Sequence, residues 1–229
     1  MTQPPASPLR KGKRAERAAL SDRRLTEAAI ELLVKRGIQG TTLQAVGHLA
    51  GYSRGLATHR FGSKAGLFGN LLKVASTDWL ERVQEAVGAK VGAEALCAAT
   101  DAAEQFIKDR PDEVRAMYIL WFLGIDPSAG YHSNIGNVHR AQRRDVAEWI
   151  RAGQRAGRVD TAVDPIRVAE QYAASMAGIV YQWLANPQMP LHAMFTQLKA
   201  DLRARIEHPE PAQGAQRARP APKAVSSRR

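Results

Sequence analysis

Residues 41–64 read TTLQAVGHLAGYSRGLATHRFGSK, and this stretch contains several local signals for helix starts and ends. The Thr-x-x-Gln pattern that starts at Thr41 has the form of a capping box and predicts a short helix that ends at Gly51. Ser53 is a good N-cap for another short helix, which we expect to end near Arg60. Two short helices joined by a tight, glycine-containing turn match a helix-turn-helix, although spacing alone fits an ordinary helical hairpin equally well.

The segments on either side of this stretch are also predicted to be helical. Upstream, apolar residues at helical spacing predict a helix from Asp22 to Arg36 that stops at Gly37. Downstream, Ser63 is the N-cap of a helix that continues past Trp79. The unit around the turn is therefore expected to be a small helical bundle.

The rest of the chain repeats the helical period and shows no sustained alternation with a period of two, so we expect an all-α fold. A loop rich in Gly, Pro, Ser and Asn is expected from Asp126 to Asn137. The other expected features are a helix around Met117–Leu123, a long helix over Val138–Ala156, a helix that begins at the Asp164-Pro165 cap and stops at Asn186-Pro187, and a last helix over Leu191–Ile206.

The positive charge is concentrated at the ends of the chain. The net charge of +11 divides into +5 over residues 1–24, +4 over 25–73, −2 over 74–208 and +4 over 209–229. We therefore expect four parts: a basic, disordered arm at 1–21, a helix-turn-helix domain at 22–73, a larger helical body at 74–208, and a disordered basic tail at 209–229.

Several classes of protein are disfavoured by what the sequence lacks. The longest apolar run, Met117–Ile125, is about half of what a membrane-spanning helix needs, and no secretory signal is apparent, so we expect a cytoplasmic protein. Cys97 is the only cysteine, and the six histidines show no metal-ligand spacing. Without a phosphate-binding loop or a nucleophile elbow, neither an enzyme nor a cofactor is expected.

Taken together, three short motifs resemble the N-terminal domain of the TetR family of transcriptional regulators. They are TTLQAVG at 41–47, AGYSRGL at 50–56 and FGSK at 61–64, followed by Leu67 and Phe68. The resemblance covers about residues 22–75. It implies a three-helix DNA-binding domain, a fourth helix that links this domain to a ligand-binding body, and a homodimer formed by the last two helices.

The resemblance also implies DNA-binding positions. Thr41, Thr42 and Lys64 match places that contact phosphates, which suits hydroxyl and ammonium donors near helix N-termini. The positions that face the major groove are Arg54, Gly55, Thr58 and His59. His59, where the family often has Tyr, could instead be a partly buried packing residue. Gly47, in place of the usual Ala, is expected to cost about 1 kcal/mol of helix stability.

In the body, bulky residues at core-like spacing are the candidates for a ligand pocket. A stripe of this kind is also what a plain core would show. The candidate wall residues are Phe106, Tyr118, Trp121, Trp149, Tyr172 and Met176. Their composition suggests a largely apolar ligand, either aromatic or cationic, because indole faces accommodate both.

Two functions therefore compete. The first is a homodimeric repressor of transcription, which a small-molecule effector of unknown identity releases from a palindromic, double-stranded operator. The second is a helical protein that binds nucleic acid without sequence preference through its basic ends. The basic arm, which includes Arg10, Lys11, Lys13, Arg14 and Arg17, could contact DNA or could only keep the protein soluble.

Overall fold

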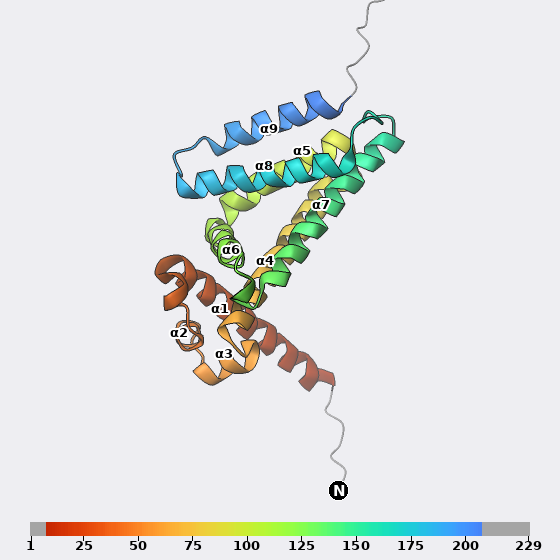
Figure 1. Ribbon diagram of the computed structural model, residues 1–229. Coiled ribbons are helices and arrows are strands. Elements are labelled where there is room, and N and C mark those ends of the chain that lie inside the picture. Colours follow the sequence, from red (N-terminus) through yellow and green to blue (C-terminus); the bar gives the residue numbers. More distant parts are fainter. Residues whose placement is uncertain (1–7, 208–229) are drawn as a thin grey trace, which may run out of the picture.

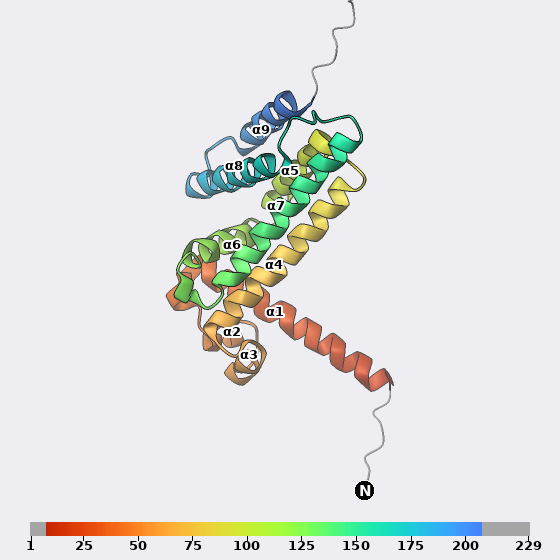
Figure 2. The same cartoon turned by 45° about the vertical axis from the view of Figure 1, so that its right-hand side comes forward.

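A computed structural model describes residues 8–207, which form nine α-helices and one 3-10 turn with no strand among them. The prediction of an all-α fold is confirmed. Figures 1 and 2 show α1, α2 and α3 grouped at one end, α5, α8 and α9 at the other, and α4 and α7 running between them. The elements are α1 (Pro8–Gly40), α2 (Leu43–Leu49), α3 (Arg54–Phe61), α4 (Lys64–Val87), α5 (Gly92–Asp109), α6 (Pro111–Leu123), the 3-10 turn η1 (Pro127–Ala129), α7 (His132–Arg155), α8 (Pro165–Ala185) and α9 (Leu191–Ile206).

Helix α1 is longer than the sequence pattern predicted. It begins at Pro8 rather than at Asp22, so the prediction of a disordered arm over 1–21 is wrong from Pro8 onward. The reason is local, since this stretch is rich in Arg, Lys, Ala and Leu, which are strong helix formers, and proline is well placed at the first helical position. Residues 1–7 and the predicted tail at 209–229 lie outside the described residues. The predicted stop is confirmed, because Gly37 breaks the helical conformation with a φ of +63°.

Serine and threonine caps define the helices of the N-terminal group. The predicted caps Ser53 and Ser63 are confirmed, and their hydroxyls accept hydrogen bonds from the backbone N–H groups of Leu56 and Gly66. The predicted opening of α2 is wrong by one residue. Its cap is Thr42, which accepts from the N–H of Ala45 at 3.0 Å. The capping-box pattern placed the start too early because two threonines stand side by side.

Gly47 has a packing role that the sequence did not reveal. A Cβ atom at this position would lie 2.9 Å from the backbone oxygen of Ser53, closer than real Cβ contacts allow. The N–H of Tyr52 also donates to the carbonyl of Gly47 at 2.7 Å. The loss of helix propensity is therefore accompanied by a tight approach of α2 to the cap of α3.

The body has its own core, in which α5, α7, α8 and α9 pack together around residues such as Phe106, Ile150 and Phe195. The predicted cap at Asp164 is confirmed, with its carboxylate accepting from the N–H of Ile166 at 2.8 Å. Helix α7 begins at His132, inside the expected loop. The reason is tertiary packing, because Tyr131, just before the helix, is buried with its ring edge-on to Phe68 of α4.

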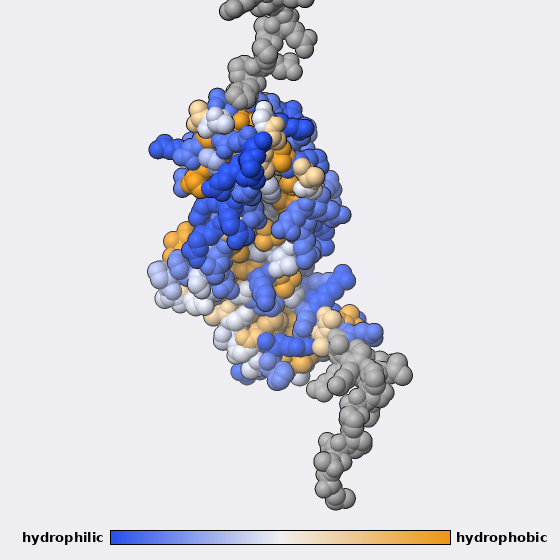
Figure 3. Space-filling model, turned by 90° about the vertical axis from the view of Figure 1, so that its right-hand side faces the viewer, coloured by the Kyte–Doolittle hydropathy of each residue, from blue (hydrophilic) through white to orange (hydrophobic). Residues whose placement is uncertain are grey.

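None of the helices in residues 8–207 is long and apolar enough to cross a membrane. Figure 3 shows the face of the molecule that lies on the right-hand side of Figure 1. Hydrophilic side chains cover most of this face, and apolar ones appear between them.

Candidate nucleic-acid interface and cavity

Helix α3 turns one face inward and leaves the other open. Ala57 is fully buried, whereas the four residues predicted to face the groove are all exposed: Arg54, Gly55, Thr58 and His59. The exposure of His59 argues against its alternative role as a packing residue. The helix therefore presents a narrow polar face with one cation at its N-terminal end.

The two arginines of α3 have different surroundings. The Nε of Arg60 lies 2.7 Å from Oδ1 of Asp22, and an Nη of Arg60 donates to the carbonyl of Ala18, so this side chain ties α3 to α1. Arg54 forms no ion pair with any residue of the described chain. Its guanidinium is thus available to an outside partner, while that of Arg60 serves the fold.

The three residues predicted to contact phosphates differ in exposure and in their hydrogen bonds. Thr42 is exposed at the start of α2. Thr41 is fully buried, and its hydroxyl donates to the carbonyl of Gly37 at 2.8 Å, so its prediction as a surface contact is wrong. The cause is the turn after Gly37, which directs this side chain inward. Lys64 is half-buried, and its ammonium donates to the carbonyl of Ile38 and lies 5.7 Å from the centre of the Phe68 ring.

A groove beside α3 contains residues that the sequence pattern had not singled out. It runs between α1, α2 and the start of α3, and its wall includes Arg36, Gln44, His48 and Arg54. Gln44 and His48 are one turn apart on the exposed side of α2, a spacing that could have indicated a shared face. This groove adds basic and amide groups next to the exposed face of α3.

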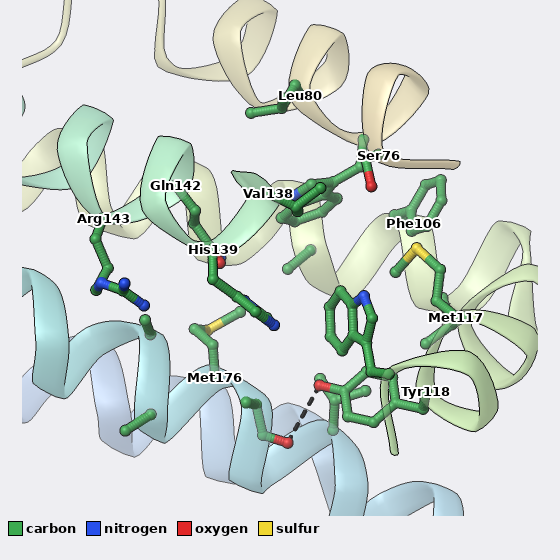
Figure 4. Close-up of a pocket in the computed structure, with 18 of the residues that line it drawn as sticks. Ser76, Leu80, Phe106, Met117, Tyr118, Val138, His139, Gln142, Arg143 and Met176 are labelled. Atoms are coloured by element: carbon green, nitrogen blue, oxygen red, sulfur yellow. Dashed lines mark hydrogen bonds between the residues drawn. The ribbon is translucent and has the colours of Figure 1, made fainter. Parts of the chain in front are cut away.

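The body contains a cavity of about 490 Å³ between α4, α5, α6, α7 and α8. Volumes of roughly 300–1,000 Å³ are typical of small-molecule sites. Figure 4 shows Phe106, Tyr118 and Met176 around it, and Trp121 also lines it. These four of the predicted wall residues are brought together by helices that are distant in the sequence.

The other two predicted wall residues do not line the cavity. Trp149 lies seven residues beyond Gln142, which does line it, so it is on a similar face of α7 but about 10 Å further along the helix. There it packs against both the main core of the body and the cluster that includes Val83 and Ala95. The buried hydroxyl of Tyr172 lies 3.1 Å from that of Thr100, which turns this ring toward α5. Burial raises the pKa of Tyr172.

Polar residues complete the cavity, and the sequence pattern did not point to them. They are Ser76 of α4, His139, Gln142 and Arg143 of α7, and Glu170 of α8. The His139 ring lies 4.9 Å from that of Trp121, between ring centres. Burial lowers the pKa of His139, with a further contribution from Arg143, so a neutral imidazole is favoured at pH 7. No cluster of residues suited to hold a metal ion occurs in residues 8–207.

The chain is similar to known proteins in two ways. Residues 25–71 match the family described as "Bacterial regulatory proteins, tetR family". No curated protein matches the chain by sequence. The match covers the helix-turn-helix group and the first part of α4.

Solved structures share the fold of about four-fifths of the chain at low sequence identity. The ketosteroid transcriptional regulator KstR2 of Mycobacterium tuberculosis is 20% identical, with a TM-score of 0.62 over 82% of this chain and 96% of its own. A transcriptional regulator from Rhodococcus sp. Rha1 is 19% identical, with a TM-score of 0.67 over 79% and 92%. A candidate regulator from Saccharomonospora viridis, solved in complex with choline, is 18% identical, with a TM-score of 0.71 over 82% and 97%.

The two kinds of likeness agree on the same architecture. The sequence match falls on the domain that carries the exposed α3 face, and the structural matches extend through the body that holds the cavity. Residues 25–71 therefore form an N-terminal domain of the tetR family of bacterial regulatory proteins.

Proposed function

We propose that this protein is a homodimeric, sequence-specific DNA-binding repressor that a small molecule releases from a palindromic operator. The observation that carries the proposal is the combination, in one chain, of an exposed α3 face with a cavity in the body to which α4 and α6 connect it. The proposal places the protein in the cytoplasm with the DNA and gives it no catalytic role. It also treats residues 22–73 and 74–208 as the DNA-binding and ligand-binding units.

DNA recognition in this proposal rests on α3. In a helix-turn-helix, the N-terminal side chains of the second helix contact base edges, and flanking groups contact phosphates. Arg54 would read guanine, the methyl group of Thr58 would contact thymine, and His59 and Gly55 would line the groove. Thr42 and Lys64 would contact the phosphates of the DNA, and the Lys64 ammonium also donates to the carbonyl of Ile38 near the end of α1.

Helix α6 supports a link between the cavity and the DNA-binding end. On one side, Ala116 and Leu120 are buried in the same cluster as the core of α1, α2 and α3. On the other side, Met117, Tyr118 and Trp121 line the cavity. A ligand that moves α6 would therefore also move the surface on which α1 rests. Such a ligand shifts the DNA-binding arrangement only if it prefers one position of α6.

The last two helices are the proposed dimer interface. Ala174, Gly178 and Tyr181 are exposed along α8, so a partner helix could approach closely. A Cβ atom added to Gly178 would meet no other atom within 4 Å. Two such helices from each subunit would form a four-helix interface and would place two copies of α3 on successive half-sites.

The proposal is tested by selecting binding sites from random-sequence DNA and footprinting the enriched sequence. A repressor of this kind enriches a palindrome with half-sites about 10 bp apart or slightly more. Candidate metabolites are then added to the complex in a fluorescence anisotropy titration, where release marks an effector. If no sequence is enriched and unrelated DNA competes equally well, the protein binds nucleic acid without sequence preference instead.

A further inference from the structure

Two polar atoms in the wall of the cavity have no hydrogen-bond partner among the described residues: Oγ of Ser76 and Nε1 of Trp121. Both atoms are buried, and the Ser76 residue as a whole is only 6% exposed. A buried donor left without a partner destabilises the folded state, because it has lost its hydrogen bonds to water. Two such atoms in one cavity therefore indicate a site made for a polar group that is not part of the chain.

The other polar groups of the cavity differ from these two. The hydroxyl of Tyr118 already donates to the carbonyl of Ala177 at 3.1 Å, as the dashed line in Figure 4 shows. In the same view, Arg143 lies on the opposite side of the cavity from Ser76. Arg143 and Glu170 bring opposite charges to the cavity, so its charged part selects neither sign. His139 and Gln142 also line the cavity, but their polar atoms are not among the buried ones without a partner, so the atoms of Ser76 and Trp121 are the ones that most need a ligand group.

The chemistry of the two atoms defines what they can bind. An indole N–H is only a donor, whereas a hydroxyl donates or accepts, so their shared complement is an acceptor oxygen. Phe106 and Met117, which also line the cavity, lie on the Ser76 side in Figure 4. Neither carries a charge, and the Arg82 guanidinium, 5.6 Å from the centre of the Phe106 ring, does not line the cavity, so an ionised ligand group beside them would be desolvated without a direct counter-ion.

We propose that the cavity binds an uncharged, largely apolar compound whose carbonyl-type oxygen accepts hydrogen bonds from Nε1 of Trp121 and Oγ of Ser76. This inference rests on the proposed function, since it names the class of the effector that would occupy the cavity. It also narrows the expectation from composition, because an ammonium group offers no acceptor to the indole N–H of Trp121, which can only donate.

Three compounds of matched shape test the inference by isothermal titration calorimetry on the full chain. Benzophenone has a carbonyl oxygen between two aromatic rings, diphenylmethane has a methylene group there, and diphenylmethylamine has an ammonium group at neutral pH. We expect benzophenone to bind about tenfold more tightly than diphenylmethane, and the amine to bind more weakly than both. Equal affinity for the first two, tighter binding of the amine, or no detectable binding of benzophenone would overturn the inference.

Variants assign the preference to the two atoms. Ser76→Ala and Trp121→Phe should each reduce the preference for benzophenone over diphenylmethane several-fold, because each removes one donor. Trp149→Phe is the matched control, since this indole lies outside the cavity, and it should keep the full preference. In nuclear magnetic resonance spectra, benzophenone should move the indole N–H signal that is absent from Trp121→Phe. A preference unchanged in both donor variants would overturn the inference.

Ser76→Ala also has a readout that needs no ligand. Removal of an unpartnered buried hydroxyl from a helix should raise the melting temperature of the ligand-free protein by about 2–4 °C. A variant that is more stable yet binds benzophenone less tightly is the signature of a binding residue. A lower melting temperature would show that the hydroxyl supports the fold and would overturn its assignment to a ligand.

The same compounds separate this inference from the proposed function when they are added to the operator complex. If the benzophenone preference holds but no compound of any class releases DNA, the inference stands and ligand release fails. If another effector releases DNA while the protein does not discriminate between benzophenone and diphenylmethane, the function stands and the inference fails.

Discussion

At the scale of single residues, Arg54 and Arg60 carry the same charge on one short helix but have different partners. Arg54→Ala should weaken binding to the selected operator by about 1–3 kcal/mol and relax the preference at one base pair, because alanine cannot form the bidentate hydrogen bonds to guanine. Fluorescence anisotropy with the operator and its single-base variants measures both effects. Unchanged affinity together with unchanged base preference would show that Arg54 does not enter the groove.

Arg60→Ala is the matched control for this prediction. Its guanidinium is bound to Asp22, so its loss should loosen the packing of α3 on α1. We expect a small fall in melting temperature, since partly exposed ion pairs contribute about 1 kcal/mol or less. The base preference of the variant should stay that of the wild type.

At the scale of elements, the first half of α1 carries the basic stretch on a helix. In Figures 1 and 2 this half extends away from the body, on the side of α3. Deletion of residues 2–17 should therefore lower the slope of log K against log salt, by up to about 0.9 for each phosphate that the shortened chain no longer neutralises. The slope comes from anisotropy titrations at several salt concentrations. A slope equal to that of the full chain would assign the stretch to solubility alone.

A second prediction at this scale concerns the contact between α5 and α9. The buried carboxylate of Glu104 accepts from Lys108 at 2.6 Å and lies 3.0 Å from Nδ1 of His192, the second residue of α9. Burial acts to raise the pKa of Glu104, but the hydrogen bonds from Lys108 and His192 outweigh it and leave the pKa below its usual value. Because the pKa of Glu104 is lower in the folded chain than in the unfolded chain, the ionised carboxylate stabilises the fold at pH values above the pKa of the unfolded chain. This stabilisation is lost as the pH falls through the pKa of the folded chain.

Glu104→Gln should therefore lower the melting temperature at pH 7, and the difference from the wild type should shrink as the pH falls below about 4. Thermal unfolding followed by circular dichroism at several pH values gives this comparison. Glu94→Gln is the control, because Glu94 is exposed where it pairs with Arg158. A deficit of Glu104→Gln that is the same at every pH would mean that the charge of Glu104 contributes nothing.

At the scale of the whole molecule, dimerisation should control DNA binding. Gly178→Trp adds bulk to the exposed side of α8, where an added Cβ atom meets no other atom of the chain within 4 Å. We expect monomers or aggregates and a loss of operator binding, because a single half-site is too weak. An obligate interface of this kind should bury roughly 2,000 Å² or more in total. Sedimentation at micromolar concentration measures the assembly state.

Leu198→Asp is a less specific test of the same interface, because Leu198 is half-buried against the core of its own chain. The wild type provides the decisive comparison. A 25.0 kDa monomer that still protects a two-fold symmetric site would show that α8 and α9 are not the interface.

Local signals in the sequence determined the helix-turn-helix and most helix ends. The caps Ser53, Ser63 and Asp164 and the stop at Gly37 were predicted correctly, because each acts through backbone groups within four residues of itself. Where two local signals competed, as at Thr41 and Thr42, the boundary was off by one residue. The exposed face of α3 was also expected from the sequence, because Arg54, Gly55, Thr58 and His59 match the groove-facing positions that the resemblance implies.

The tertiary structure alone decided which side chains meet in the cavity. Trp121 and Trp149 both occur at core-like spacing in the sequence. Only Trp121 lines the cavity, because the position of Trp149 on α7 lies beyond the end of the cavity. In the sequence, nothing distinguishes Ser76 from other residues of a long helix. Its role becomes visible only because α6 places Trp121 in the same cavity. Helical periodicity fixes the direction in which a side chain points around the axis of its helix. A site built from five helices depends instead on where the axes of those helices cross.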